Sequence, residues 1–543
     1  MTILTLDHFR RAIADIVEHG DNDVLPFDID TRFIAERAEE LANLAFNLGA
    51  ILEKKTQADC IGTLDAITVF SERLLAPAGS SGFRIATKIH PFWNIYLNGI
   101  GVALAERHEA VRSNRAHSYR FVSKGPALFD KSASWRAFRE ATISDCDPKN
   151  TSELVVQTDV SSFYEHVYHH RLENFVRDVL PAGSNHAVQI DVLLRKLASG
   201  RSFGLPVGGQ FSRILAEILM GSIDRTLDAS SVRWRRYVDD FVLIGETQRD
   251  AYRSLGVLAH ALGDLGLSLN RSKTTFLSSR HYREYVQTQL TAPDSATQRL
   301  KEIDLHFDPY SDTADDEYEA LRETVSQIDI AKLVAVELDK GQPDSFVVTQ
   351  VSRALRLLEP ANALGICATL LEQRNLHAFR ANWSTIMRGI AFIRDDDRHK
   401  EIHEHLDKHL DAVPAHSPHL VNVDTNAMHF LRTIRFRKTS ARATFVLSLY
   451  SSNSPITVRR ACIDCWRHWH DRDRFLSLRN EWEALSEEEQ RMLWLAAPVF
   501  GDDGVKFQKQ VSRAASNTWG TGIGGRTGSD FAKLYIGWVA SVT

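Results

Sequence analysis

Two adjacent aspartates, Asp239 and Asp240, lie between two segments that have the composition of β-strands. The segment before them, 232–236, is apolar and basic, and the segment after them, 241–245, is apolar. Together with Tyr237 and Val238 they predict a tight β-hairpin. Neighbouring carboxylates repel each other and lose ionisation unless a cation holds them. The hairpin therefore predicts a divalent-metal site, and phosphoryl transfer is the chemistry that such sites commonly support.

A third carboxylate, Asp159, ends a short apolar segment upstream of the hairpin. A strand end with one carboxylate beside a hairpin with two predicts a two-metal centre held by Asp159, Asp239 and Asp240. Mg²⁺ is the expected ion because it prefers oxygen ligands and keeps several waters, and Mn²⁺ is the alternative. By itself, Asp159 would serve equally well as a helix N-cap or a turn residue. The hairpin downstream favours the metal site.

Length and composition limit the classes of protein to consider. A chain of 543 residues predicts roughly two to four domains. The net charge of −5 does not exclude a nucleic-acid partner, because such a partner needs only a local basic surface, and Arg233, Arg235 and Arg236 are clustered. We expect a cytoplasmic protein with no membrane partner, because no apolar run or N-terminal signal pattern indicates otherwise. The five cysteines are predicted to be reduced thiols.

The hydrophobic pattern divides the chain into four parts. Residues 1–80 have helical periodicity, and residues 81–290 alternate strand and helix signals. Residues 291–340 include an acidic stretch at 308–317 that predicts a surface loop or linker, and residues 341–543 predict amphipathic helices joined by short turns. In the second part, the order strand–helix–hairpin–helix–strand predicts a sheet of ferredoxin-like type. The last part predicts a stacked, degenerate helical repeat.

Four motifs follow one another within residues 80–290. The first is Asp159-Val-Ser-Ser-Phe163-Tyr164 and the second is Gly204-Leu-Pro-Val-Gly-Gly-Gln-Phe-Ser212. The third is Tyr237-Val-Asp-Asp240 and the fourth is Leu267-Ser-Leu-Asn-Arg-Ser-Lys273-Thr. In this order they resemble motifs A to D of reverse transcriptases. The resemblance implies an α+β fingers-and-palm domain over 81–290 that uses dNTPs, a thumb-like segment over 291–340, and an all-α C-terminal domain.

The resemblance assigns nucleotide-binding roles to residues of motifs A and B. Gly208 and Gly209 would let the backbone approach the nascent base pair, with Gln210 beside them. Tyr164, or else Phe163, would block the sugar C2′ position and so exclude the 2′-hydroxyl of ribonucleotides. For both aromatic residues the alternative is packing in the core beneath the palm.

Two basic residues and one departure from the family pattern complete the resemblance. Lys273 would assist the leaving pyrophosphate as a charge partner or acid, and Arg120 would hold the triphosphate. The alternatives are a solvated lysine and an ordinary ion pair. Val207 stands where many templated enzymes carry glutamine. With Ser118–Phe121 and the long helical half, it makes the chain resemble bacterial antiphage reverse transcriptases of the abortive-infection group.

That narrower resemblance implies HEAT-like repeats, homo-oligomers and, in some members, DNA made without a template on a protein hydroxyl. The leading function is therefore an antiphage DNA polymerase that adds dNTPs by two-metal phosphoryl transfer, protein-primed and template-independent, with covalently attached product. A second is a templated RNA-directed DNA polymerase that copies a dedicated non-coding RNA. A third is an inactive palm that serves as a binding scaffold, although idle sites have no need to retain costly paired carboxylates.

Three weaker patterns imitate functional sites. Cys462 and Cys465, with histidines nearby, imitate a zinc site, but they share the apolar face of one helix and are predicted to lie in the core. The glycine-rich stretch 520–528 imitates a dinucleotide-binding loop, but no βαβ unit surrounds it, so a flexible turn is expected. The histidines of segment 399–409 are expected on a solvated helix face.

Overall fold

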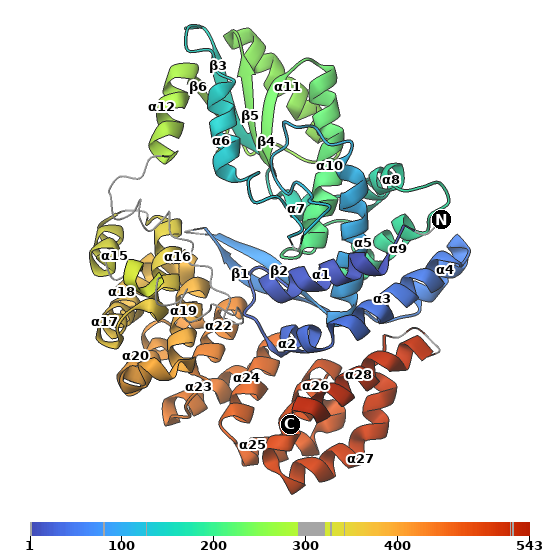
Figure 1. Cartoon of the computed structure of the whole chain (residues 1–543), viewed down its shortest axis with the longest axis vertical. Helices are drawn as coiled ribbons and strands as arrows, with labels where there is room; N and C mark the ends of the chain where they lie inside the picture. The colour runs from blue at the N-terminus through green and yellow to red at the C-terminus, as the bar shows by residue number, and fades with distance from the viewer. Residues whose placement is uncertain are drawn as a thin grey trace.

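The computed structural model describes residues 3–79, 82–125, 127–290, 321–325, 328–340, 343–521, 523 and 526–542. The sheet with its covering helices lies at one end of the molecule, and the N-terminal helices with a two-stranded hairpin lie in the middle (Figure 1). The helical C-terminal half curves around this middle part (Figure 1). The acidic stretch 308–317, and most of the predicted thumb-like segment 291–340, lie outside the described residues.

The N-terminal part is built around one buried helix, α5. Its elements are α1 (Leu6–His19), α2 (Ile29–Glu36), α3 (Ala38–Glu53), α4 (Gln57–Asp65), β1 (Ser71–Ala78), β2 (Gly82–Ile89) and α5 (Pro91–Glu109). Phe9, Ile13 and Ile16 form the buried face of α1, as the helical period predicts, and α1 packs against α5. Strands β1 and β2 pair antiparallel. The predicted boundary at residue 80 therefore falls within a hairpin, and the preceding segment is not wholly helical.

The second part contains a four-stranded antiparallel sheet in the order β4-β5-β3-β6. Its elements are α6 (Trp135–Ser144), β3 (Leu154–Asp159), α7 (Phe163–His166), α8 (His169–Val179), α9 (His186–Leu197), α10 (Gln210–Ala229), β4 (Arg233–Tyr237), β5 (Asp240–Gly245), α11 (Gln248–Gly263), β6 (Thr275–Ser278) and α12 (Ser279–Leu290).

Helices cover both faces of this sheet. Val156, Phe241 and Leu243 belong to the large core that includes α10 and α11. The alternate residues Val155 and Val242 face a smaller core with side chains of α6 and α12. This alternation follows from the two-residue period of a strand. Both faces of β3 and β5 are therefore covered, and the polar residues Asp159 and Asp240 stand at the ends of these strands.

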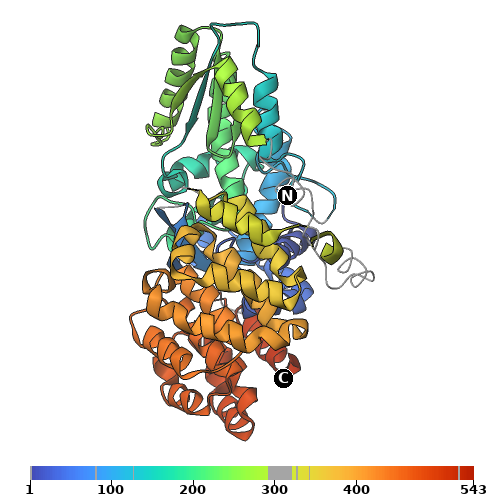
Figure 2. The same cartoon turned by 90° about the vertical axis from the view of Figure 1, so that its left-hand side faces the viewer.

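The C-terminal half is rich in helices, as predicted, and its described residues include no β-strand. Its elements are α15 (Ile330–Asp339), α16 (Ser345–Ala354), η1 (Leu355–Leu357), α17 (Pro360–Leu371), α18 (Gln373–Ala378), η2 (Arg380–Asn382), α19 (Trp383–Asp395), η3 (Asp397–Ile402), α20 (His403–His416), α21 (Pro418–Val421), α22 (Asp424–Ile434), α23 (Ser440–Ser451), α24 (Ile456–His468), α25 (Arg472–Asn480), η4 (Trp482–Ala484), α26 (Glu487–Ala496), η5 (Ala497–Phe500), α27 (Asp502–Thr518) and α28 (Arg526–Val542). The helices stack in successive layers (Figure 2). Ser486 and Glu489 form a capping box at the start of α26. HEAT-like repetition stays a prediction.

The helical half holds the outer strand of the N-terminal hairpin by polar contacts. Asp424, in the first turn of α22, accepts a hydrogen bond of 2.7 Å from the Leu75 N–H. The Glu72 carboxylate accepts hydrogen bonds of 2.7 Å from the backbone N–H groups of Ile456 and Thr457. Because these N–H groups belong to the start of α24, Glu72 satisfies donors that a helix leaves unpaired.

The last helix completes the core of the first ones. The ring of Phe33 in α2 lies 5.7, 5.2 and 5.2 Å from the rings of Phe531, Tyr535 and Trp538 in α28. The indole N–H of Trp538 donates to Glu36 over 2.7 Å. Residues near the two ends of the chain are therefore packed together, which Figure 1 shows as α28 beside α2 and α3.

A buried ionic cluster lies where the N-terminal part meets the helical half. Its members are Asp21, Asp28, Asp30, Lys88, Arg460, Glu488 and Arg491. Lys88 Nζ lies 2.5 Å from Asp21 and 3.1 Å from Asp30, and Arg460 lies 2.9 Å from Asp30. Nearly all these groups are removed from water. Loss of one partner would therefore leave a buried charge unpaired and lower the free energy of unfolding by roughly 3–5 kcal/mol.

Candidate active site

The strand register brings together the three aspartates that the sequence analysis selected. Asp159, the last residue of β3, stands opposite Asp240, the first residue of β5. Tyr237 ends β4 and pairs with Asp240, so Val238 and Asp239 form a two-residue loop. The carboxylates of motifs A and C therefore meet at one corner of the sheet.

The loop has an unusual backbone conformation that neighbouring side chains hold in place. Val238 has a φ of 57°, a left-handed conformation that β-branched residues rarely adopt. Its N–H donates to the Ser118 hydroxyl over 2.8 Å, and its carbonyl accepts from Arg236 over 2.9 Å. Both backbone polar groups of the strained residue are thus bound by buried side chains.

A buried network behind the loop connects it to helix α10. The Ser118 hydroxyl donates to Glu217 over 2.6 Å. Arg236 pairs with Glu217 at 3.0 Å and with Asp224 at 2.7 Å, and Arg112 pairs with Glu217 at 2.6 Å. These ion pairs keep the pKa of Arg236 raised despite its complete burial. Because α10 begins at motif B, the network fixes motif C relative to motif B.

The carboxylates lie in an environment that opposes their ionisation. Burial, followed by the neighbouring Asp240, raises the pKa of Asp239 to about 6. Burial and the Asp159 charge raise the pKa of Asp240. Lys273 Nζ lies 2.6 Å from Asp159 Oδ2, and this hydrogen bond raises the pKa of Lys273. One ammonium therefore neutralises Asp159, whereas the charges of the other two carboxylates stay costly.

The donor set fits a divalent cation. Asp159 Oδ1 is buried and has no hydrogen-bond partner in the structure. Three carboxylates with an unpartnered buried oxygen suit hard cations that take oxygen ligands, such as Mg²⁺ or Mn²⁺. Among the described residues, no three His, Cys, Asp or Glu side chains already form a shared metal cage. Lys273 binds the other oxygen of this carboxylate, Oδ2, and leaves Oδ1 for a cation.

The three nucleotide-binding residues predicted in motif B have different surroundings. Gly208 has a φ of +120°, and a Cβ there would lie 2.1 Å from Asn22 Oδ1. The space beside Gly208 is therefore filled by a protein side chain, whereas a Cβ at Gly209 would have no protein atom within 4 Å. Gln210 begins α10, where its amide accepts from Arg213 over 2.9 Å and donates to Asp15 over 3.4 Å. Of the two glycines, Gly209 is therefore the one with a face that no protein side chain fills.

The two aromatic candidates of motif A also differ. The Phe163 side chain lies in the core, and Tyr164 is only half-buried. Burial, followed by the proximity of Tyr119, raises the pKa of Tyr164, and Asp239 contributes in the same direction. Asp239 and Tyr164 therefore share one environment. This position suits Tyr164, rather than Phe163, for contact with the sugar of a bound nucleotide.

Arg120, predicted to hold the triphosphate, is engaged elsewhere. Its guanidinium pairs with Glu109 at 2.6 Å and donates to the Ser113 carbonyl over 2.8 Å. Arg213, which no sequence motif indicated, lies near enough to Tyr164 of motif A to lower the pKa of that residue against the effect of burial. Its guanidinium stacks 5.3 Å from the ring centre of Tyr119 and pairs with Asp23 at 2.8 Å. The sequence feature that could have identified Arg213 is its position one turn into α10, just after the glycines of motif B.

A cavity of about 270 Å³ lies beside the Leu205–Val207 segment of motif B. Arg73 from the hairpin and Arg201 line it together with Phe203, and the Arg201 guanidinium lies 5.7 Å from the Phe203 ring centre. The backbones of Tyr168 and Phe203 form an isolated antiparallel β-bridge, and both aromatic side chains are exposed. Exposed rings beside arginines are suited to stack bases and bind phosphates of a single strand.

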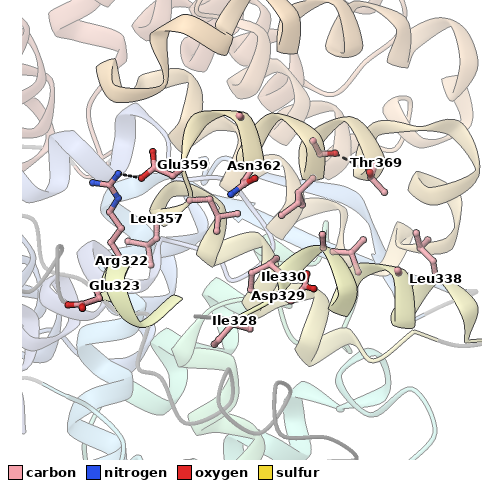
Figure 3. Close-up of a pocket in the computed structure, with 17 residues that line it drawn as sticks. Arg322, Glu323, Ile328, Asp329, Ile330, Leu338, Leu357, Glu359, Asn362 and Thr369 are labelled. Atoms are coloured by element: carbon pink, nitrogen blue, oxygen red, sulfur yellow. Dashed lines mark hydrogen bonds and ion pairs between the residues drawn. The ribbon is translucent and has the colours of Figure 1, made fainter. Parts of the chain in front are cut away.

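A larger cavity, of about 1030 Å³, lies in the helical half between α15 and α17 (Figure 3). Its walls are mostly aliphatic side chains, with Arg322, Glu359 and Asn362 toward the rim. It contains none of the motif residues. It is therefore separate from the corner of the three aspartates.

Within the part of the chain that the structure describes, the cysteine and histidine patterns do not form a metal site. Cys462 and Cys465 are buried in α24, as predicted, and burial raises the pKa of both thiols. His399 is buried and its Nε2 lies 3.1 Å from the Leu358 carbonyl, whereas His405 is exposed. The glycine-rich stretch 520–528 lies partly outside the described residues. None of the helices described is both long and apolar enough to cross a membrane.

Comparison with known proteins identifies the domain that carries this corner. Residues 107–301 match the family model of reverse transcriptase (RNA-dependent DNA polymerase). The chain therefore contains a reverse transcriptase domain, which indicates a nucleotidyltransferase with DNA polymerase activity. No curated protein sequence matches the chain.

Two solved structures show remote similarity. The telomerase of Candida albicans, in complex with a TWJ fragment of telomeric RNA, is 12% identical with a TM-score of 0.29 over 63% of this chain and 66% of that one. The apo telomerase of Candida tropicalis is 11% identical with a TM-score of 0.31 over 65% and 66%. At this level of similarity, no substrate or partner is transferred to this chain.

Proposed function

We propose that this protein is a DNA polymerase of reverse-transcriptase type, which adds dNTPs to a hydroxyl group by two-metal phosphoryl transfer. One observation carries the proposal. The register that sets Asp159 opposite Asp240, next to Asp239 in the loop, lies within the domain that matches the reverse transcriptase family. A paired-charge corner of this kind is costly to fold and is retained where a cation is bound.

The surrounding residues suit the steps of nucleotide addition. Asp159, Asp239 and Asp240 would hold Mg²⁺ or Mn²⁺, which would activate the attacking hydroxyl and neutralise charge on the triphosphate. Lys273, whose ammonium donates to Asp159, would give a proton to the leaving pyrophosphate. Tyr164 limits the space at the sugar C2′ position and thereby selects deoxynucleotides.

Two modes of synthesis have separate support. Val207 and the Ser118–Phe121 motif support protein-primed, untemplated synthesis with covalently attached DNA, in a cytoplasmic antiphage protein that forms homo-oligomers. The cavity lined by Arg73, Arg201 and Phe203 supports templated copying of RNA, because it offers stacking and phosphate contacts for a single strand. Both modes use the same three aspartates.

Labelled dNTPs test the function and separate the modes. The full-length protein is incubated with Mg²⁺ and labelled dNTPs, with or without an RNA template and DNA primer. Label that migrates with the denatured protein in the absence of nucleic acid supports protein priming. Product that requires RNA and primer supports templated copying.

Two variants complete this experiment. Asp239→Ala is expected to abolish incorporation, whereas Asp178→Asn, exposed on α8, is expected to match the wild type. Wild-type protein that incorporates nothing under either condition would contradict the proposal and favour a binding scaffold. Equal activity of Asp239→Ala and the wild type would contradict it as well.

A further inference from the structure

The loop between α1 and α2 lies against the turn of motif B. Asn22 in this loop is 2% exposed. Its Nδ2 donates to the Val207 carbonyl over 3.0 Å and to the Thr87 carbonyl over 3.1 Å, while its Oδ1 accepts from the Val24 N–H over 3.1 Å. The amide therefore uses both of its donors and one acceptor to join the loop, strand β2 and motif B.

The same loop contacts Gly208 directly. The Asp23 N–H donates to the Gly208 carbonyl over 3.0 Å. Asn22 occupies the space that a side chain at 208 would need, and the φ of +120° is itself one that L-residues rarely adopt. Gly208 is thus fitted to Asn22 on one face, while Gly209 next to it stays open.

The loop extends its contacts into the start of α10. The Asp23 carboxylate pairs with Arg213 at 2.8 Å, and Arg213 stacks on Tyr119. Asp15, near the end of α1, accepts from Gln210. Side chains of residues 15–23 therefore hold both the turn and the first helical turn that follows it.

The helical half anchors this loop from the other side. Asp21 and Asp30, which flank the loop residues, belong to the buried ionic cluster with Lys88 and Arg460. His429 Nε2 lies 3.0 Å from the Val24 carbonyl. Motif B is therefore connected through a short, buried segment to helices α22 and α24, far from it in sequence.

We propose that Asn22 is a positioning residue for the nucleotide-binding turn 206–209, and that it sets the affinity for the incoming dNTP. The inference rests on the proposed polymerase function. Without its two donated hydrogen bonds, the turn is held to β2 mainly by the Thr87 N–H, which donates to the Val207 carbonyl over 3.1 Å. Gly209 and Tyr164 then lose their fixed separation across the nucleotide site. The cost falls on nucleotide binding more than on the chemical step, because the carboxylate corner is held by the separate Ser118–Glu217 network.

Asn22→Asp tests the proposal, because it keeps the side-chain volume and removes both donors. The expected result is a rise of about tenfold in KM for dNTP with kcat changed less than about threefold. Asn43→Asp is the matched control, since Asn43 is exposed and donates only to Glu39. A KM for Asn22→Asp equal to that of the wild type would overturn the proposal.

A second pair of variants covers the case in which Asn22→Asp fails to fold. Gly208→Ala should raise KM by itself, and it should do so less in the Asn22→Ala background, because the clash with the amide is then gone. Independent effects of the two substitutions would contradict direct contact. A merely stabilising role would lower the unfolding temperature of Asn22→Ala without the selective change in KM.

Hydrogen exchange separates failure of this inference from failure of the polymerase function. If the wild type incorporates no dNTP, the polymerase proposal fails. The exchange of backbone amides in 20–25 and 85–89 then decides on Asn22, since Asp23 and Thr87 donate to Gly208 and Val207. Faster exchange of both segments in Asn22→Asp supports the positioning role, and unchanged exchange overturns it.

Discussion

At the residue scale, Val238 shows how the corner of the three aspartates holds its shape. A β-branched residue in the left-handed region costs about 1–3 kcal/mol. Ser118 and Arg236 bind its two backbone polar groups, and both side chains are completely buried. The strain is therefore offset by contacts that fix the direction in which Asp239 points.

Ser118→Ala is expected to lower kcat about tenfold with little change in KM for dNTP, because the loop that carries Asp239 loses one of its two clamps. The buried Val238 N–H then has no acceptor, which costs about 1–3 kcal/mol of unfolding free energy. Steady-state kinetics and urea unfolding measure both effects. Ser132→Ala, at an exposed position, is the control, and an unchanged kcat in Ser118→Ala would refute the clamp.

Asp239→Asn is expected to abolish incorporation and to stabilise the cation-free protein. The folded-state pKa of Asp239, about 6, lies above its ordinary value of 3.8. Stability contributed by this group is therefore present below pH 4 and is lost as pH rises through 6. At pH 7, the variant should exceed the wild type by roughly 1–3 kcal/mol in EDTA. A less stable variant would show that the charge is not costly.

The sequence predicted the carboxylates but not the residues that hold them. Asp159, Asp239 and Asp240 each belong to a short motif that neighbouring residues are enough to recognise. Asn22 contacts Val207 across 185 positions, and Ser118 contacts Val238 across 120. A buried polar side chain that binds distant backbone has no periodicity or motif of its own, so such residues become visible only in the fold.

At the element scale, the β1–β2 hairpin connects the helical half of the molecule to motif B. Its outer strand binds α22 and α24 through Leu75 and Glu72, and its inner strand binds motif B through Thr87. The sequence did not reveal β1, because Ser71–Ala78 contains leucine, alanine and a proline that do not favour strands. Pairing with β2 and contact with the helical half decide its conformation.

Glu72→Ala is expected to lower the free energy of unfolding by about 1–3 kcal/mol, because the first N–H groups of α24 lose a charged acceptor at the helix N-terminus. Urea unfolding of the full chain measures the loss. Glu246→Ala, at an exposed position of the palm, is the matched control. If the two variants unfolded at the same urea concentration, the Glu72 carboxylate would contribute nothing to the stability of the contact between β1 and α24.

At the scale of the whole molecule, the free energy of unfolding is expected to fall in acid, because His429 connects the helical half to the loop between α1 and α2. Burial, followed by Arg388, lowers the pKa of His429 to about 3, and Arg432 also lowers it. Because the unfolded chain takes up the proton first, stability is complete above pH 6.5 and falls as pH drops toward 3. The loss reaches about 1.4 kcal/mol per pH unit for this one group.

His429→Gln tests this expectation, because an amide can still donate to the Val24 carbonyl but cannot titrate. Between pH 7 and pH 5, the urea midpoint of the wild type should fall further than that of the variant. His405→Gln, at an exposed position, should follow the wild type. Identical pH dependence of all three proteins would exclude His429 as a source of acid sensitivity.

The contact between α2 and α28 has a consequence for how the protein is made. Glu36 and Trp538 are 502 positions apart, and a ribosome that adds about 5–20 residues per second needs roughly 25–100 s between them. Throughout that interval the nascent N-terminal helices present an uncovered aromatic face, which is the kind of surface that chaperones hold. The loop between α1 and α2, which contacts motif B, also depends on the buried ionic cluster. Two members of that cluster, Arg460 and Glu488, are synthesised much later than the loop. Polypeptides still attached to the ribosome should therefore make no DNA, and activity should begin only after translation has passed the last helix.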